Sequence, residues 1–142
     1  MTAIKILLVD DETDYLRTLE KRLQKRGFVV CAVTSGEEAL KQLATFPADV
    51  VLLDVKLRGM DGLTTLHKIK RTWSHVEVIM LTGHANQEVA IHGLELGAFE
   101  YLMKPVDFEE LLYKLEDACV RKTFQINEHG LKKFEKTNGN TQ

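Results

Sequence analysis

The sequence predicts a single α/β domain, built as a doubly wound parallel sheet of five strands with helices on both faces. Five short apolar runs recur along the 142-residue chain, and segments with helical periodicity separate them. Most of these runs are apolar throughout, which is typical of parallel strands that are covered on both faces. With 44% hydrophobic and 28% charged residues, the chain is long enough to bury a sizeable core.

The predicted strands are rich in branched and aromatic residues, and they cover residues 4–9, 28–33, 49–54, 76–81 and 98–103. Two of the intervening segments carry an apolar stripe at helical spacing, formed by Tyr15, Leu16, Leu19 and Leu23 and by Phe108, Leu111, Leu112 and Leu115. Capping-box pairs that start helices are Ser35 with Glu38 and Asp107 with Glu110. Gly27 and Gly97 suit helix ends. Right-handed crossovers then place the helices on both faces.

Charge and cysteine usage exclude several classes of protein. The net charge of −2 and the pI near 6.2 give no general attraction for nucleic acid or anionic membranes. Cys31 and Cys119 lack the spacing of a metal site or a redox motif, which favours reduced thiols in the cytoplasm. The N-terminal apolar run is too short for the apolar part of a signal peptide and leads straight into acidic residues, and no run of about 18 apolar residues is present in the sequence. We therefore expect a cytoplasmic protein that binds neither nucleic acid nor a membrane.

Polar residues follow the predicted strands at their carboxyl ends, where open α/β sheets bind ligands. Asp10 and Asp11 follow the first strand and Asp54 ends the third. Thr82 and Lys104 follow the fourth and fifth strands. The sequence leaves the strand order open, but the flavodoxin-like order 2-1-3-4-5 sets the first and third strands side by side. In that order the three aspartates are neighbours.

Crowded carboxylates repel one another, and a divalent cation removes this conflict. Oxygen donors without nearby cysteine or histidine favour Mg²⁺ over zinc. Mg²⁺ and Lys104 would oppose the charge of a phosphoryl group, and Thr82 would donate to one of its oxygens. A remaining carboxylate can then attack phosphorus in line, which gives an aspartyl phosphate.

Four segments in register carry a family resemblance: "LLVDDE", "VVLLDVKLRGMDG", "IMLTGHA" and "GAFEYLMKPVDFEELL". Together they resemble the receiver domain of two-component response regulators, over roughly residues 4–120. The resemblance implies that Asp54 is the phosphoacceptor. It also implies that Asp10, Asp11 and Asp54 hold Mg²⁺ together with the backbone carbonyl of Lys56.

The same resemblance assigns roles to residues around the phosphoryl group. Thr82 and Lys104 contact it, and the Lys104–Pro105 peptide bond is cis. Thr82 moves toward phosphate and the ring of Tyr101 follows, although Tyr101 also suits a half-buried strand position without any such role. Lys56 and His84 control the access of water, and hence the phosphoryl lifetime.

The resemblance predicts a receiver domain over residues 1–122 and a tail over 123–142 that is partly helical or disordered. A histidine kinase or a histidine phosphotransfer protein phosphorylates such a domain. The fourth helix, fifth strand and fifth helix then change their surface to control a downstream protein. The resemblance thus implies a phosphorylated switch rather than a turnover enzyme.

Two other functions remain open from the sequence. The chain is alternatively the N-terminal receiver part of a longer DNA-binding or ATPase transcription regulator. A function of another class is a metal-dependent phosphatase of flavodoxin-like fold that uses the same carboxylates.

Overall fold

The computed structural model describes residues 3–83 and 86–121, and in these residues five parallel strands form one sheet of order β2-β1-β3-β4-β5. The strands are β1 Lys5–Val9, β2 Val29–Val33, β3 Val50–Leu53, β4 Glu77–Thr82 and β5 Glu100–Met103. The helices are α1 Thr13–Lys25, α2 Gly36–Leu43, α3 Gly62–Thr72, α4 Gln87–Glu95 and a further helix over 108–121. The predicted fold and strand order are confirmed.

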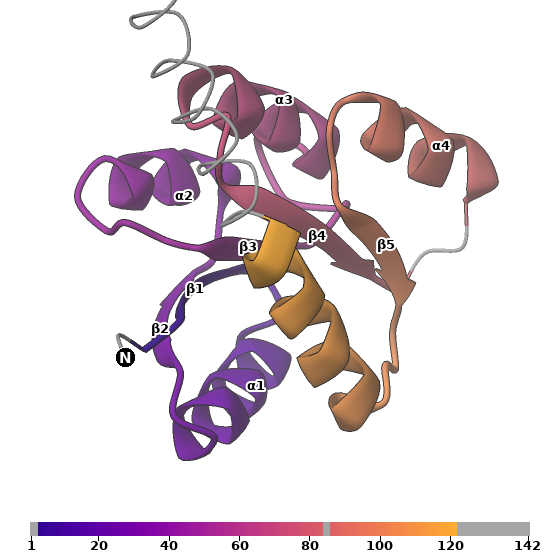
Figure 1. Cartoon of the computed structure of the whole chain (residues 1–142). Coiled ribbons are helices and arrows are strands. Elements are labelled where there is room, and N and C mark those ends of the chain that lie inside the picture. The colour runs from indigo at the N-terminus through magenta and orange to yellow at the C-terminus, as the bar shows by residue number, and fades with distance from the viewer. Residues whose placement is uncertain (1–2, 84–85, 122–142) are drawn as a thin grey trace, which may run out of the picture.

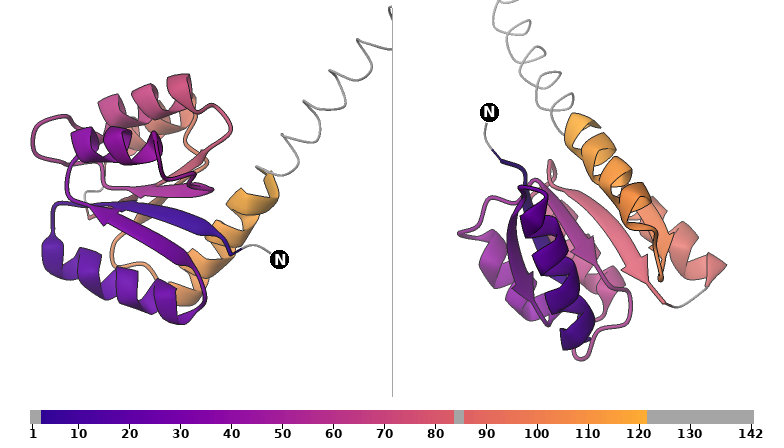
Figure 2. Two further views of the ribbon diagram at one scale, coloured as in Figure 1. Left: turned by 90° about the vertical axis from the view of Figure 1, so that its left-hand side faces the viewer. Right: turned by 90° about the horizontal axis from the view of Figure 1, so that it is seen from below.

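Helices cover the sheet on both faces (Figure 1). One layer contains α2, α3 and α4, and the other contains α1 and the 108–121 helix, with the sheet between them in the edge-on view of Figure 2. Successive residues of a strand point to opposite faces, so Leu7 and Val9 pack in one core and Ile6 and Leu8 in the other. This double coverage explains why the middle of each central strand is apolar on both faces.

Local signals in the sequence set the helix ends. Ser35 Oγ accepts a hydrogen bond from the Glu38 amide at 3.1 Å at the start of α2. After the C-terminal end of α4, Gly97 adopts a φ of 107°, a conformation that favours glycine. The Ala98 amide donates to the Gly93 carbonyl at 3.0 Å, so Ala98 still belongs to the helix end. The fifth strand consequently begins at Glu100 rather than at residue 98.

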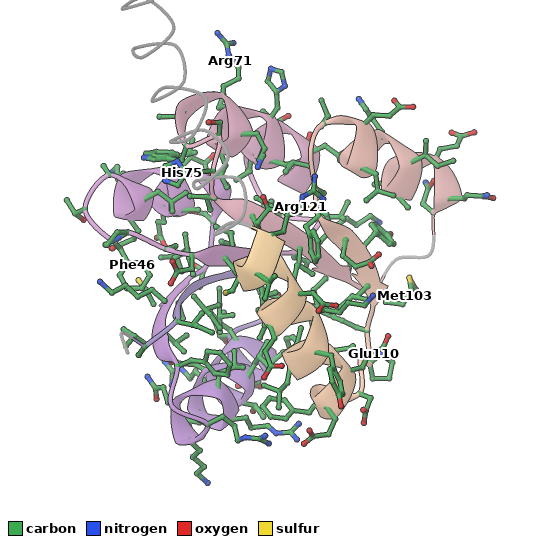
Figure 3. All side chains as sticks on the ribbon, viewed as in Figure 1. Phe46, Arg71, His75, Met103, Glu110 and Arg121 are labelled. Carbon is green, nitrogen blue, oxygen red and sulfur yellow. The ribbon has the colours of Figure 1, made fainter. Side chains whose placement is uncertain are left out.

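A buried acid forms ion pairs at the amino ends of the strands, opposite the predicted site. Glu77, at the start of β4, lies 3.9 Å from Lys70 Nζ of α3 and 3.9 Å from Arg121 Nε of the 108–121 helix. Figure 3 shows Arg121 at this end of the sheet and Met103 at the opposite end, where β5 leaves the sheet. The two helices are therefore tied to β4 away from the candidate site.

The described residues include no helix that combines the length and the apolar character needed to cross a membrane. His84 and the predicted tail over 123–142 lie outside the described residues.

Candidate functional site

The pairing of β1 with β3 brings two aspartates together at the carboxyl edge of the sheet. Val9 pairs with Leu53, and Asp10 and Asp54 directly follow these residues. The Asp54 amide donates to the Val9 carbonyl at 3.0 Å, which continues the ladder into the site. Asp10 and Asp54 are only 6% and 5% exposed. Two carboxylates are therefore held side by side at the end of an apolar core.

Lys104 reaches these carboxylates from the end of β5. Its amide donates to the Thr82 carbonyl at 2.7 Å, and its peptide bond to Pro105 is cis. Its Nζ atom lies 2.5 Å from Asp10 Oδ2 and 3.6 Å from Asp54 Oδ2. One ammonium group thus contacts both buried aspartates.

A third carboxylate, that of Glu12, completes the group, although no sequence pattern predicts this role for it. One oxygen each of Asp10, Glu12 and Asp54 lie within 4.8 Å of one another, and Glu12 Oε1 lies 3.5 Å from Lys104 Nζ. Glu12 precedes the first turn of α1 and stands two residues after Asp10. In the sequence, the only indication of this role is that Glu12 is the third consecutive acid of "LLVDDE". Asp11 is half-buried and is not a member of this group, so its role as a metal ligand stays a prediction.

The charges of this group do not balance. Three carboxylates and one ammonium leave two negative charges. Burial raises the pKa of Asp10 above its ordinary value despite the hydrogen bond from Lys104, and the charge of Asp54 adds to the increase. Burial lowers the pKa of Lys104, but Asp10, Asp54 and Glu12 outweigh it and the net direction is upward. Hard oxygen donors with an excess of two negative charges fit a divalent cation such as Mg²⁺.

Backbone amides fix the orientation of both aspartates. Asp10 Oδ1 accepts from the Glu12 amide at 2.9 Å, and Asp54 Oδ1 accepts from the Lys56 amide at 3.3 Å. Each Oδ2 faces Lys104. The side chain of Lys56 is exposed beside the site. The Oδ1 atoms are therefore held by backbone amides, and both Oδ2 atoms face the ammonium group of Lys104.

Thr82 and Tyr101 lie on the two strands beyond β3. Thr82 is the last residue of β4 and is fully buried. Tyr101 is half-buried on β5, where it pairs with Met80. Burial raises the pKa of the Tyr101 phenol, while a hydrogen bond with the backbone of Asn86 opposes this. Tyr101 therefore connects β5 with the residues that precede α4.

Tyr15 is another neighbour of the site, although its sequence position indicates only a place in the apolar stripe of the first helix. The centroid of its ring lies 4.3 Å from Lys104 Nζ, a cation–π distance. The ring therefore packs against the ammonium group from α1.

Comparison with known proteins agrees with this geometry. The model of the family described as "Response regulator receiver domain" matches residues 6–116. The transcriptional regulatory protein ZraR of Escherichia coli K12 is 38% identical over 115 residues, which are 81% of this chain and 26% of ZraR. The chain therefore spans about a quarter of this curated relative.

Solved structures give the same picture. A CheY-like receiver domain protein from Methanospirillum hungatei has a TM-score of 0.84 at 30% identity, covering 87% of this chain and 99% of that one. NtrX from Brucella abortus has a TM-score of 0.85 at 29% identity, covering 93% of this chain and 31% of NtrX. The likeness thus extends from the sequence to the whole described fold, and the chain belongs to the response regulator receiver domain family.

Proposed function

We propose that this chain is a phosphoacceptor switch in which Asp54 takes a phosphoryl group, with Mg²⁺, from a histidine kinase or a histidine phosphotransfer protein. The observation that carries the proposal is the placement of Lys104 Nζ between Asp10 and Asp54 at a site with two uncompensated negative charges. Such a site suits a divalent cation and a dianionic phosphoryl group together.

Asp54 is the better nucleophile of the two buried aspartates. Among the described residues, its Oδ1 atom accepts a 3.3 Å hydrogen bond from the Lys56 amide, and its Oδ2 atom lies 3.6 Å from Lys104 Nζ. Asp10 is engaged more closely, at 2.5 Å from Lys104 Nζ and 2.9 Å from the Glu12 amide. The carboxylate of Asp54 is therefore freer to form a new bond.

Phosphoryl transfer needs one bond to form and one to break. An oxygen of Asp54 bonds to phosphorus while the bond between phosphorus and the histidine nitrogen of the donor breaks, and the donor imidazole keeps the electron pair. Lys104 and the Thr82 hydroxyl would hold the oxygens of the phosphoryl group. Mg²⁺, held by Asp10, Asp54 and the Lys56 carbonyl with Asp11 or Glu12, would neutralise charge on those oxygens.

The output surface in this proposal is formed by α4, β5 and the 108–121 helix. In the described part of the chain, five large apolar side chains on these elements are exposed, namely Ile91, Leu94, Met103, Tyr113 and Val120. Tyr101 of β5 contacts the backbone at Asn86, just before α4. Movement of Tyr101 would therefore change this surface, and exposed apolar groups suit a protein partner.

The relatives also favour the interpretation that the chain is the receiver part of a longer transcription regulator. The similarity to ZraR covers 26% of that protein and the similarity to NtrX covers 31%. In this proposal the receiver domain covers residues 1–122. We also propose that it acts in the cytoplasm, because Cys31 and Cys119 are free thiols. The mass of the native protein tests whether further domains are attached.

Stoichiometry tests the proposed function. Incubation with acetyl phosphate and Mg²⁺ should load about one phosphoryl group per chain, and inorganic phosphate should then appear slowly. Rapid and sustained release of phosphate from a small phosphorylated substrate, without a phosphorylated chain, would instead indicate a metal-dependent phosphatase.

A further inference from the structure

Glu37 lies in the first turn of α2 and is hydrogen bonded to the loop that follows Asp54. Its Oε1 atom accepts from the Met60 amide at 2.9 Å. Gly59, at φ 77°, lies against the same carboxylate, because a Cβ atom at Gly59 would be 3.0 Å from Glu37 Oε1. The carboxylate therefore fits closely over the turn at Gly59 and Met60.

This loop joins β3 to α3 and carries Lys56. At its base, the Lys56 amide donates to Asp54 Oδ1 at 3.3 Å and the Gly62 amide donates to the Val55 carbonyl at 2.8 Å. Leu57 packs into the core beside α2 and α3. Glu37 adds a side-chain contact from another element at the far side of the loop. The hydrogen bond to Met60 thus connects the loop to α2.

The packing beneath this hydrogen bond is tight. A Cβ atom at Gly36 would lie 3.3 Å from the Met60 carbonyl oxygen and would collide with the side chain of Thr65. The start of α2 therefore lies directly against the loop and the first turns of α3. Hydrogen bonds from the Glu37 and Met60 amides hold the pKa of the Glu37 carboxyl below its ordinary value, so the group is an ionised acceptor.

We propose that Glu37 is a positioning residue for the phosphorylation site, which fixes the loop after Asp54 so that the backbone of Lys56 stays beside the carboxylates. The inference rests on the proposed function of Asp54 and Mg²⁺. Glu37 itself is not a member of the carboxylate group around Lys104. It acts through Met60 and the loop, as outer groups that orient metal ligands do.

The neighbouring residue gives a matched control. Glu38 lies in the same helical turn and carries the same charge, but its Oε2 atom accepts from the Thr34 amide at 3.2 Å. Glu38→Ala therefore removes the same charge from α2 without removing the hydrogen bond to Met60. Glu37→Gln retains a side-chain oxygen that can accept from Met60, so it should restore positioning without the charge.

The experiment compares the full chain with its Glu37→Ala, Glu37→Gln and Glu38→Ala variants. Amide hydrogen exchange at Met60 and Mg²⁺ titration by NMR are measured for each. We expect Glu37→Ala to speed exchange at Met60 and to raise the Mg²⁺ Kd about fivefold relative to Glu38→Ala, the effect of one net hydrogen bond. Glu37→Gln should stay close to the wild type in both measurements.

The outcomes separate this inference from the function on which it rests. If the wild type binds Mg²⁺ and Glu37→Ala matches Glu38→Ala in Mg²⁺ affinity, Glu37 is not a positioning residue. A Glu37→Gln variant as weak as Glu37→Ala would also overturn the inference, because charge alone would then matter. If the wild type fails to bind Mg²⁺, both the proposed function and this inference are wrong.

Discussion

Lys104 Nζ lies 2.5 Å from Asp10 Oδ2, although the two residues are 94 positions apart in the sequence. Only 10% of the Lys104 side chain and 8% of the Asp10 side chain, without their backbone atoms, are exposed. The strand order makes this contact possible because β1 and β5 lie on either side of β3 and β4 and all end at the same edge. The ion pair is therefore a direct consequence of the topology, and it places a positive charge beside Asp54.

Removal of the Lys104 ammonium group should destabilise the folded protein. In Lys104→Ala, three clustered carboxylates lose their ammonium partner, so we expect the free energy of unfolding without Mg²⁺ to fall by about 2 kcal/mol. Urea denaturation in EDTA measures this. The control is Lys114→Ala, because Lys114 pairs with Glu100 at 3.0 Å in a more exposed place. Solvent screens such a pair, so its loss should destabilise the protein less than Lys104→Ala does. Equal losses in the two variants would argue against a coupled charge group.

Asp11 and Glu12 are alternative candidates for one ligand of the proposed metal site. We expect Asp11→Asn to weaken Mg²⁺ binding at neutral pH, because the resemblance makes it a ligand and the change removes one negative charge. Mg²⁺ titration by NMR measures the affinity, and Asp14→Asn in the first turn of α1 is the control for charge alone. If Asp11→Asn matches Asp14→Asn while Glu12→Gln loses affinity, the ligand is Glu12.

Phosphorylation should change the surface that we assign to output. If phosphate draws Thr82 inward and Tyr101 follows, NMR signals should shift over about residues 86–120 as well as near Asp54. Spectra recorded before and after phosphorylation give the result, and Asp54→Asn treated in the same way is the control. Shifts confined to the neighbourhood of Asp54 would mean that the site and the output surface are not coupled.

Lys56 and His84 should control the phosphoryl lifetime. Water must approach phosphorus in line with the bond to Asp54, and a large side chain at either position should obstruct that path. We therefore expect Lys56→Asn and His84→Ala to lose phosphate faster than the wild type. The time course of dephosphorylation after removal of the donor measures this. An unchanged or slower rate in either variant would show that the replaced side chain does not obstruct water.

The sequence predicted most of the fold because apolar runs and capping signals are local. Ser35 and Gly97 mark helix ends through hydrogen bonding and a positive φ that involve only nearby residues. The predicted start of the fifth strand is two residues too early, since Ala98 is apolar but its amide donates to the Gly93 carbonyl. Periodicity does not reveal such a hydrogen bond.

The site was only partly predictable because side-chain direction depends on tertiary contacts. The strand ends indicated Asp10, Asp54 and Lys104, which the structure brings together. Glu12 was not assigned, because an acid before a helix usually serves the helix start, and here it approaches Lys104 instead. No sequence pattern indicates the contact of Glu37 with the loop after Asp54, since its partner Met60 is 23 residues away.

Phosphorylation of Asp54 itself tests the central claim most directly. The wild type, Asp54→Asn and Asp10→Asn are incubated with acetyl phosphate in Mg²⁺ or in EDTA, and intact mass and peptide mapping locate the modification. We predict one phosphoryl group on the wild type, at Asp54, in Mg²⁺ only, and none on Asp54→Asn. A wild type that gains no phosphate in Mg²⁺, or an Asp54→Asn variant that gains phosphate as readily as the wild type, would contradict the account.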